Sequence, residues 1–171
     1  TDTAFSVGAT YVTTAGDSTV TIGGGMVTSE GNSTNQSNAN SDSVALSASV
    51  VTGDLTVGAG FSTGEGLAQE GSVSINEIDD VEVINVGASY VSGDMTFTVS
   101  YKDGSVKSAE LGTAAGTSTD SQEVVGASVD YAVASGVTAT IGYENRDDTL
   151  NGAAVPSDSG GSIYLGAKIS F

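Results

Sequence analysis

Apolar and small polar residues alternate along nine segments of this 171-residue chain. Successive side chains of a β-strand point to opposite faces, so this alternation predicts strands whose two faces meet different surroundings. Helical spacing of apolar residues is nearly absent, and 24 Gly with a single Pro favour strands and turns. The predicted strands are Thr3–Thr13, Ser18–Thr28, Ser43–Thr52, Leu55–Thr63, Glu82–Val91, Met95–Lys102, Ser121–Val133, Val137–Arg146 and Gly161–Phe171.

The two faces differ in a way that is unusual for a water-soluble sheet. One face collects Val, Ile, Leu, Ala, Met and aromatic residues, whereas the other is mostly Gly, Ser and Thr, such as Thr56, Gly58 and Gly60. A soluble sheet usually carries many Lys, Glu and Arg on its solvent side. The pattern predicts that the apolar face contacts lipid and that the small polar face lines a water-filled lumen.

Short turns and long polar connections alternate along the chain. The short turns are Thr14–Asp17, Gly53–Asp54, Ser92–Asp94 and Ala134–Gly136, and the long connections are Ser29–Asp42, Gly64–Val81, Asp103–Asp120 and Asp147–Gly160. This order places all turns at one end of the sheet and all long connections at the other, as in transmembrane β-barrels. The repeat of about forty residues is also compatible with a propeller, but a blade needs four strands in each repeat rather than two.

Composition excludes several classes of function. The net charge of −17 repels nucleic acid, and the absence of Cys and His excludes the usual zinc sites, disulfides and thiol or imidazole catalysis. No nucleophile–base pair or phosphate-binding loop is recognisable, so we expect no enzyme. No run of about twenty apolar residues is present, and membrane passage would therefore be by strands.

Aromatic residues lie near the predicted strand ends on the apolar face. Tyr11, Tyr90, Tyr131 and Phe171 fall toward the short turns, and Phe5, Phe61, Tyr101 and Tyr143 fall toward the long connections. This distribution predicts the two aromatic belts that flank a bilayer. The alternative is that these rings close the ends of a sandwich core.

The last segment is an amphipathic strand that ends on an aromatic residue. Its apolar face consists of Ile163, Leu165, Ala167, Ile169 and Phe171. This ending resembles the C-terminal signature of bacterial outer-membrane β-barrels. The resemblance implies that Phe171 helps the barrel-assembly machinery to recognise the chain, and the alternative is a terminal strand without such a role.

Taken over its whole length, the chain is similar to the C-terminal half of a bacterial general porin of the sixteen-stranded trimeric type. The resemblance implies an all-β fold, a transmembrane antiparallel β-barrel of which about nine strands are present. Residues 1–171 would form the C-terminal part of a single barrel domain whose N-terminal strands, about seven, are missing, because nine strands cannot close an antiparallel barrel. It also implies a homotrimer in the bacterial outer membrane that lets ions and small hydrophilic solutes diffuse passively, with no cofactor.

Four charged residues are predicted to line the pore on the small polar face. They are Lys102, Asp130, Glu144 and Lys168. For Lys102 and Glu144, near the long connections, a solvated position at the rim is the alternative. In a pore, such charges tune ion preference through the local field.

Acidic clusters occupy two of the predicted long connections. They are Glu77, Asp79, Asp80 and Glu82, and the pair Asp147 and Asp148. Oxygen-rich loops can hold calcium, which could bridge them to lipopolysaccharide phosphates, although the spacing does not match an EF-hand. The alternative is that both clusters are simply solvated.

At the level of the whole protein, the alternative to a porin is a soluble extracellular β-sandwich adhesin or surface-layer module.

Overall fold

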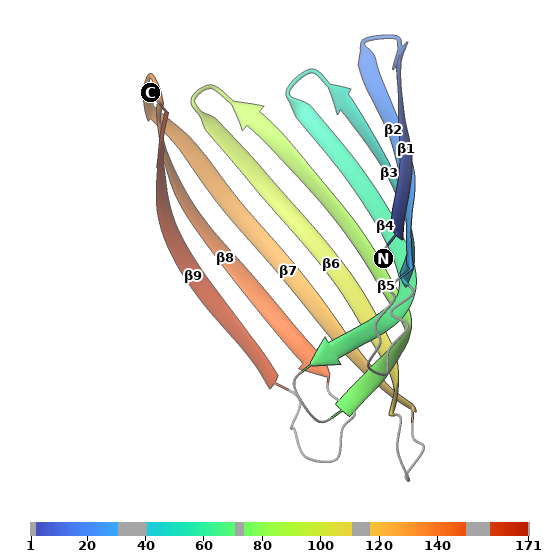
Figure 1. Cartoon of the computed structure of the whole chain (residues 1–171). Coiled ribbons are helices and arrows are strands. Elements are labelled where there is room, and N and C mark those ends of the chain that lie inside the picture. The colour runs from blue at the N-terminus through green and yellow to red at the C-terminus, as the bar shows by residue number, and fades with distance from the viewer. Residues whose placement is uncertain (1–2, 31–40, 71–73, 111–116, 150–157, 171) are drawn as a thin grey trace.

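The computed structural model describes residues 3–30, 41–70, 74–110, 117–149 and 158–170, and it arranges them as strands of a single sheet (Figure 1). The strands are β1 Thr3–Ala15, β2 Ser18–Glu30, β3 Ser41–Thr52, β4 Leu55–Glu70, β5 Ser74–Ser92, β6 Met95–Glu110, β7 Thr117–Ala134, β8 Val137–Thr149 and β9 Asp158–Ile169. Each strand pairs antiparallel with the next, so the order in the sheet follows the order in the chain. The all-β prediction is confirmed, and the described residues include no helix long and apolar enough to cross a membrane.

The sheet is curved but does not close on itself (Figure 1). Within the part of the chain that the structure describes, the outer edges of β1 and β9 pair with no further strand. Both strands run from the end of the sheet with the long connections, here called the long-loop end, toward the end with the short turns. Joining these two edges directly would therefore make a parallel pair in an otherwise antiparallel sheet.

Four tight turns connect β1 to β2, β3 to β4, β5 to β6 and β7 to β8, all at the short-turn end. Each contains a glycine with positive φ, between 56° and 75°, which a residue with a Cβ adopts only with strain: Gly16, Gly53, Gly93 and Gly136. Backbone hydrogen bonds join two of these turns to the end of the neighbouring strand: Val91 N of β5 donates to Asp54 O at 2.9 Å, and Ala132 N of β7 donates to Asp94 O at 2.8 Å. The predicted positions of the short turns are confirmed.

Two of the four predicted long connections are wrong, because most of their residues extend the strands. β4 continues to Glu70 and β5 begins at Ser74, while β6 continues to Glu110 and β7 begins at Thr117. The alternation of apolar residues stops at the bilayer edge, but ladder hydrogen bonds between neighbouring strands continue beyond it. Register shifts between Gly64 and Gly66 and between Ile78 and Asp80 mark bulges where this extension bends.

No described side chain forms a buried apolar core. The apolar face is instead exposed along its whole length, for example Phe5 at 58%, Val99 at 56% and Leu165 at 79%. A sandwich would require a second sheet about 10 Å away to cover this face, and the described residues form one sheet only. The exposed apolar face therefore speaks against the soluble adhesin and is what a lipid-facing barrel wall requires.

The small polar face is the less exposed of the two. Along the middle of the sheet Thr56, Thr98 and Ser128 are half-buried, whereas their neighbours Val57 and Val99 are exposed. Side chains converge on the concave side of a curved sheet and spread apart on the convex side. The small polar face accordingly lines the concave side, called here the lumen face, and the apolar face points outward.

The strand register shows how far the strands tilt. At the long-loop end, the outward apolar residues begin at Phe5 on β1 and at Ile163 on β9. Following the register partners of Ile163 from strand to strand leads to Thr13 on β1, which lies eight residues beyond Phe5. The stagger is thus about one residue for each of the eight steps between strands. With a rise of about 3.3 Å per residue and a strand spacing of about 4.8 Å, a level apolar band requires a tilt of about 35°. Transmembrane barrels have tilts of about 35–45°.

The aromatic residues mark both edges of this band. The outward-facing rings near the long-loop end of the band are Phe5, Phe61, Tyr101 and Tyr143, and those near the short turns are Tyr11, Tyr90 and Tyr131. Phe171, predicted for the second belt, lies outside the described residues. A sandwich core would bury these rings, but Tyr11 is 64% exposed.

An arginine in the middle of the outward band should destabilise the barrel. Replacing Val99 by Arg is expected to lower the free energy of unfolding by about 2 to 4 kcal/mol, because the guanidinium would enter hydrocarbon. Thr98→Arg is the matched control, since Thr98 faces the lumen and its arginine would stay in water. The measurement is equilibrium unfolding of the full-length barrel in lipid vesicles, and equal losses for both variants would contradict the assignment of faces.

Candidate pore-lining face

The middle of the lumen face consists of small, uncharged side chains. Between the two aromatic levels the described strands present residues such as Thr21, Ser49, Gly58, Ser89, Thr98 and Ser128. These side chains project little from the backbone, and their hydroxyl groups can hydrogen-bond water. Such a wall leaves space for water along the concave side of the sheet.

Charged side chains on this face lie at its two ends, which we call the long-loop mouth and the short-turn mouth. Lys102 and Glu144 each follow a belt tyrosine, Tyr101 and Tyr143, and so lie at the long-loop mouth. Asp130 and Lys168 are register partners of Thr140 and Thr138 at the short-turn mouth. All four predicted pore-lining residues therefore share the lumen face, while their role in a pore stays a prediction.

At the short-turn mouth a hydrogen bond crosses from β8 to β7, where Thr140 Oγ1 donates to Asp130 Oδ1. This contact satisfies one oxygen of Asp130, a half-buried carboxylate. It links neighbouring strands on the side that faces water.

Arg146 and Asp148 also face the lumen, at the long-loop mouth, and sequence reasoning missed both of them as pore-lining candidates. Arg146 Nε donates to Asp148 Oδ2 at 2.7 Å and to Oδ1 at 2.9 Å, so the two side chains form an ion pair. This hydrogen bond and a second one from Gln122 hold the pKa of the Asp148 carboxyl below its usual range. Both residues lie beyond the apolar band. Arg146 is the last residue of the predicted strand, and Asp148 lies past its predicted end, because β8 continues to Thr149. Extending the alternation past the last apolar residue would have found them.

Tyr164 of β9 covers the backbone of β8 inside the lumen. Gly142 is its register partner, and a Cβ added at Gly142 would collide with the Tyr164 ring. Gly142 is the one residue that is buried among those the structure describes. The ring therefore shields the β8–β9 backbone hydrogen bonds from lumen water at this point.

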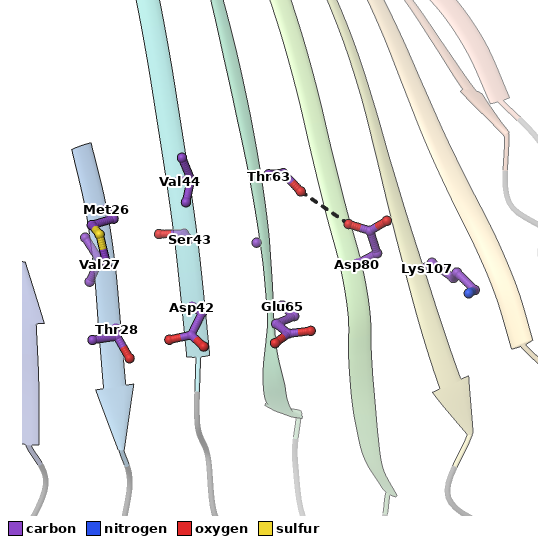
Figure 2. A pocket seen from close by; sticks show the side chains of 11 residues that line it. Met26, Val27, Thr28, Asp42, Ser43, Val44, Thr63, Glu65, Asp80 and Lys107 are labelled. Atoms are coloured by element: carbon purple, nitrogen blue, oxygen red, sulfur yellow. Dashed lines mark hydrogen bonds between the residues drawn. The ribbon is translucent and has the colours of Figure 1, made fainter. Parts of the chain in front are cut away.

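The outward face carries carboxylates just beyond the apolar band at the long-loop end. A hollow of about 860 Å³ opens there between Met26 and Val44 of the band edge and the charged residues Asp42, Glu65, Asp80 and Lys107 (Figure 2). Thr63 Oγ1 donates to Asp80 Oδ1 at 3.4 Å across β4 and β5. Because the hollow lies directly beyond the lipid-facing residues along the strands, it is at the depth of the lipid headgroups.

The predicted position of the acidic clusters in flexible loops is wrong. Glu77, Asp79, Asp80 and Glu82 belong to β5, and Asp147 and Asp148 belong to β8. Asp147 faces outward and Asp148 faces the lumen, so these two carboxylates cannot share one ion. Within the described residues no group of three or more carboxylates is placed to hold a metal ion, and the calcium hypothesis stays a prediction.

The described part of β9 has the predicted amphipathic pattern. Ile163, Leu165, Ala167 and Ile169 pair with the outward residues Tyr143, Ile141, Ala139 and Val137 of β8. These four residues therefore belong to the lipid-facing band. Their predicted role in assembly, and that of Phe171, stays a prediction.

The fold and its two faces define the class of protein: the sheet is the wall of an outer-membrane β-barrel, and its concave side contacts water. The sequence profile of the Gram-negative porin family matches residues 1–152, and the chain belongs to this family. Membership places the protein in the bacterial outer membrane. A comparison with curated protein sequences gives no match.

Solved structures support the same fold. The outer-membrane expressed OmpT of Vibrio cholerae is similar at 19% identity with a TM-score of 0.59, over 97% of this chain and 56% of OmpT. A loop L8 deletion mutant of OmpT is similar at 18% identity with the same TM-score, over 94% of this chain and 51% of the mutant. A trimer form of in-vitro folded OmpT is similar at 18% identity with a TM-score of 0.50, over 91% of this chain and 54% of that one. The chain thus spans about half the length of these structures.

Contact between Tyr164 and Gly142 should couple the two positions energetically. Gly142→Ala must displace the ring, whereas the same substitution in a Tyr164→Ala background meets no ring, so we expect the double variant to be more stable than the sum of the single losses by about 0.5 to 1 kcal/mol. A double-mutant cycle of unfolding free energies measures this coupling. Strict additivity would show that the ring does not lie over Gly142 in the membrane.

Proposed function

We propose that this chain forms part of the wall of a passive diffusion channel in the outer membrane. The observation that carries the proposal is the pairing of an exposed apolar face with a concave face of small, neutral residues. Water, ions and small hydrophilic solutes would pass along the concave face down their gradients, with no chemical step. Family membership and the fold shared with OmpT support this function.

The sheet requires further strands to become a closed barrel. The free edges of β1 and β9 would leave backbone N–H and C=O groups unpaired in hydrocarbon, at several kcal/mol for each group. Because β1 and β9 run in the same direction, an odd number of additional strands restores antiparallel pairing at both edges. A second copy of this sheet inserted in the same orientation would not, since each new contact would again be parallel. We infer that polypeptide outside residues 1–171 supplies these strands, with this sheet as the C-terminal part of one barrel domain.

The partners of the barrel follow from its surfaces. A trimer form of OmpT supports a homotrimer here. The outward carboxylates Asp42, Glu65 and Asp80 lie at headgroup level, which supports contact with lipopolysaccharide phosphates through bridging divalent cations such as calcium. The apolar β9 supports recognition by the barrel-assembly machinery.

The channel should prefer cations at low salt. The net charge of −17 creates a negative potential that a pore with low-dielectric walls focuses. Reversal potentials of the reconstituted full-length trimer in a KCl gradient should show potassium preferred over chloride. The preference should weaken from 0.01 M to 1 M salt as the screening length falls from about 30 Å to about 3 Å. Chloride preference at low salt would contradict the prediction.

Phe171 should matter for assembly rather than for transport. Phe171→Ala is expected to reduce the amount of folded barrel in the outer membrane, because the resemblance to outer-membrane β-barrels assigns this aromatic residue a part in recognition by the assembly machinery. Conductance of the channels that do assemble should stay unchanged. Ser170→Ala is the matched control on the opposite side, and heat-modified gel mobility of outer-membrane fractions measures the folded amount. Equal yields for the two variants would contradict a signal role.

A further inference from the structure

A hollow on the lumen face collects two of the four basic residues of the chain. Its volume is about 350 Å³, and it opens at the long-loop mouth between β5 and β8. Lys102 and Arg146 occupy one register row of the sheet with Val124 between them, which sets their Cα atoms about 10 Å apart. The chain has only Lys107 and Lys168 as further cations, and neither of them lines this hollow.

The remaining lining gives the hollow a mixed chemical character. Val81, Val83 and Val106 form an apolar strip on one side, and Gly104, two residues after Lys102, adds no side chain to the lining. Asp148 and Gln122 line the other side, and Asp120, the register partner of Val106, adds a second carboxylate to the lining. Arg146 is 54% exposed, and its ion pair with Asp148 is made through Nε, so this contact does not use the terminal nitrogens of the guanidinium. Lys102 is exposed.

We propose that this hollow binds small zwitterionic solutes, namely amino acids with short aliphatic side chains, on their way through the channel. This inference rests on the proposed channel function. The solute carboxylate would meet Lys102 and the terminal nitrogens of Arg146, its ammonium group would meet Asp148, and its side chain would contact the valines.

Net charge decides between this class of ligand and a simple anion. The field of a protein with net charge −17 repels an anion from the mouth before it reaches the two cations. A zwitterion carries no net charge and enters without this repulsion. The short-range, charge-assisted hydrogen bonds of Lys102 and Arg146 then act on its carboxylate.

Current recordings on single full-length trimers in planar bilayers test the inference with three probes of similar size. L-Valine, added on the long-loop side, should interrupt the potassium current in a concentration-dependent manner. Valinamide, which lacks the carboxylate, and N-acetylvaline, which lacks the ammonium group, should interrupt it at least about tenfold more weakly. Equal interruption by valine and valinamide would overturn the proposal.

Variants identify the site. Lys102→Gln and Arg146→Gln should each weaken the valine effect about tenfold, and Arg146→Lys should restore part of it. Lys107→Gln removes the same charge from the outward face and should leave the effect unchanged. The same loss in Lys102→Gln and Lys107→Gln would overturn the proposal, since only net charge would then matter. Absence of any conductance would contradict the channel function itself, whereas normal conductance without valine-dependent interruptions would contradict this inference alone.

Discussion

Backbone hydrogen bonding in a medium without water is the constraint on which this structure depends. Hydrocarbon offers no partners for peptide N–H and C=O groups, so strands can cross it only as members of a continuous ladder. The sequential antiparallel order of nine strands meets that demand everywhere except at the outer edges of β1 and β9. The same demand explains why side chains need no buried core here: the ladder and the surrounding lipid, rather than apolar packing inside the sheet, hold the wall together.

Strand tilt and side-chain alternation then determine where apolar and charged side chains lie. Alternation separates an outward apolar band from a lumen face. The apolar band shifts by about one residue from each strand to the next, which keeps it parallel to the bilayer plane although the strands are tilted. Charges follow the same geometry. They are excluded from the middle of both faces and gather at the two mouths and along the outward rim, where water or headgroups solvate them. The carboxylates in Figure 2 and the Lys102–Arg146 row are two results of this exclusion, one on each side of the sheet.

Particular residues show how far sequence reasoning reached and where it stopped. The turns at Gly16, Gly53, Gly93 and Gly136 were predictable because positive φ selects glycine locally. The extensions of β4, β5, β6 and β7 were not, since beyond the bilayer a strand persists through its neighbour's hydrogen bonds without any apolar pattern of its own. The same misjudged boundary hid Asp148, which only the longer β8 places on the lumen face, whereas Arg146 was already the last residue of the predicted strand.

The sequence by itself determined which residues share a face, because the period of two along a strand is a property of the local backbone. It also determined the ends at which turns and belts lie, through glycines and aromatic residues whose preferences are local. Tertiary structure alone decided which residues of different strands stand side by side, since cross-strand register depends on pairing between segments far apart in the chain. That register brings Lys102 next to Arg146, puts Tyr164 over Gly142, and leaves Asp147 and Asp148 on opposite sides of one wall.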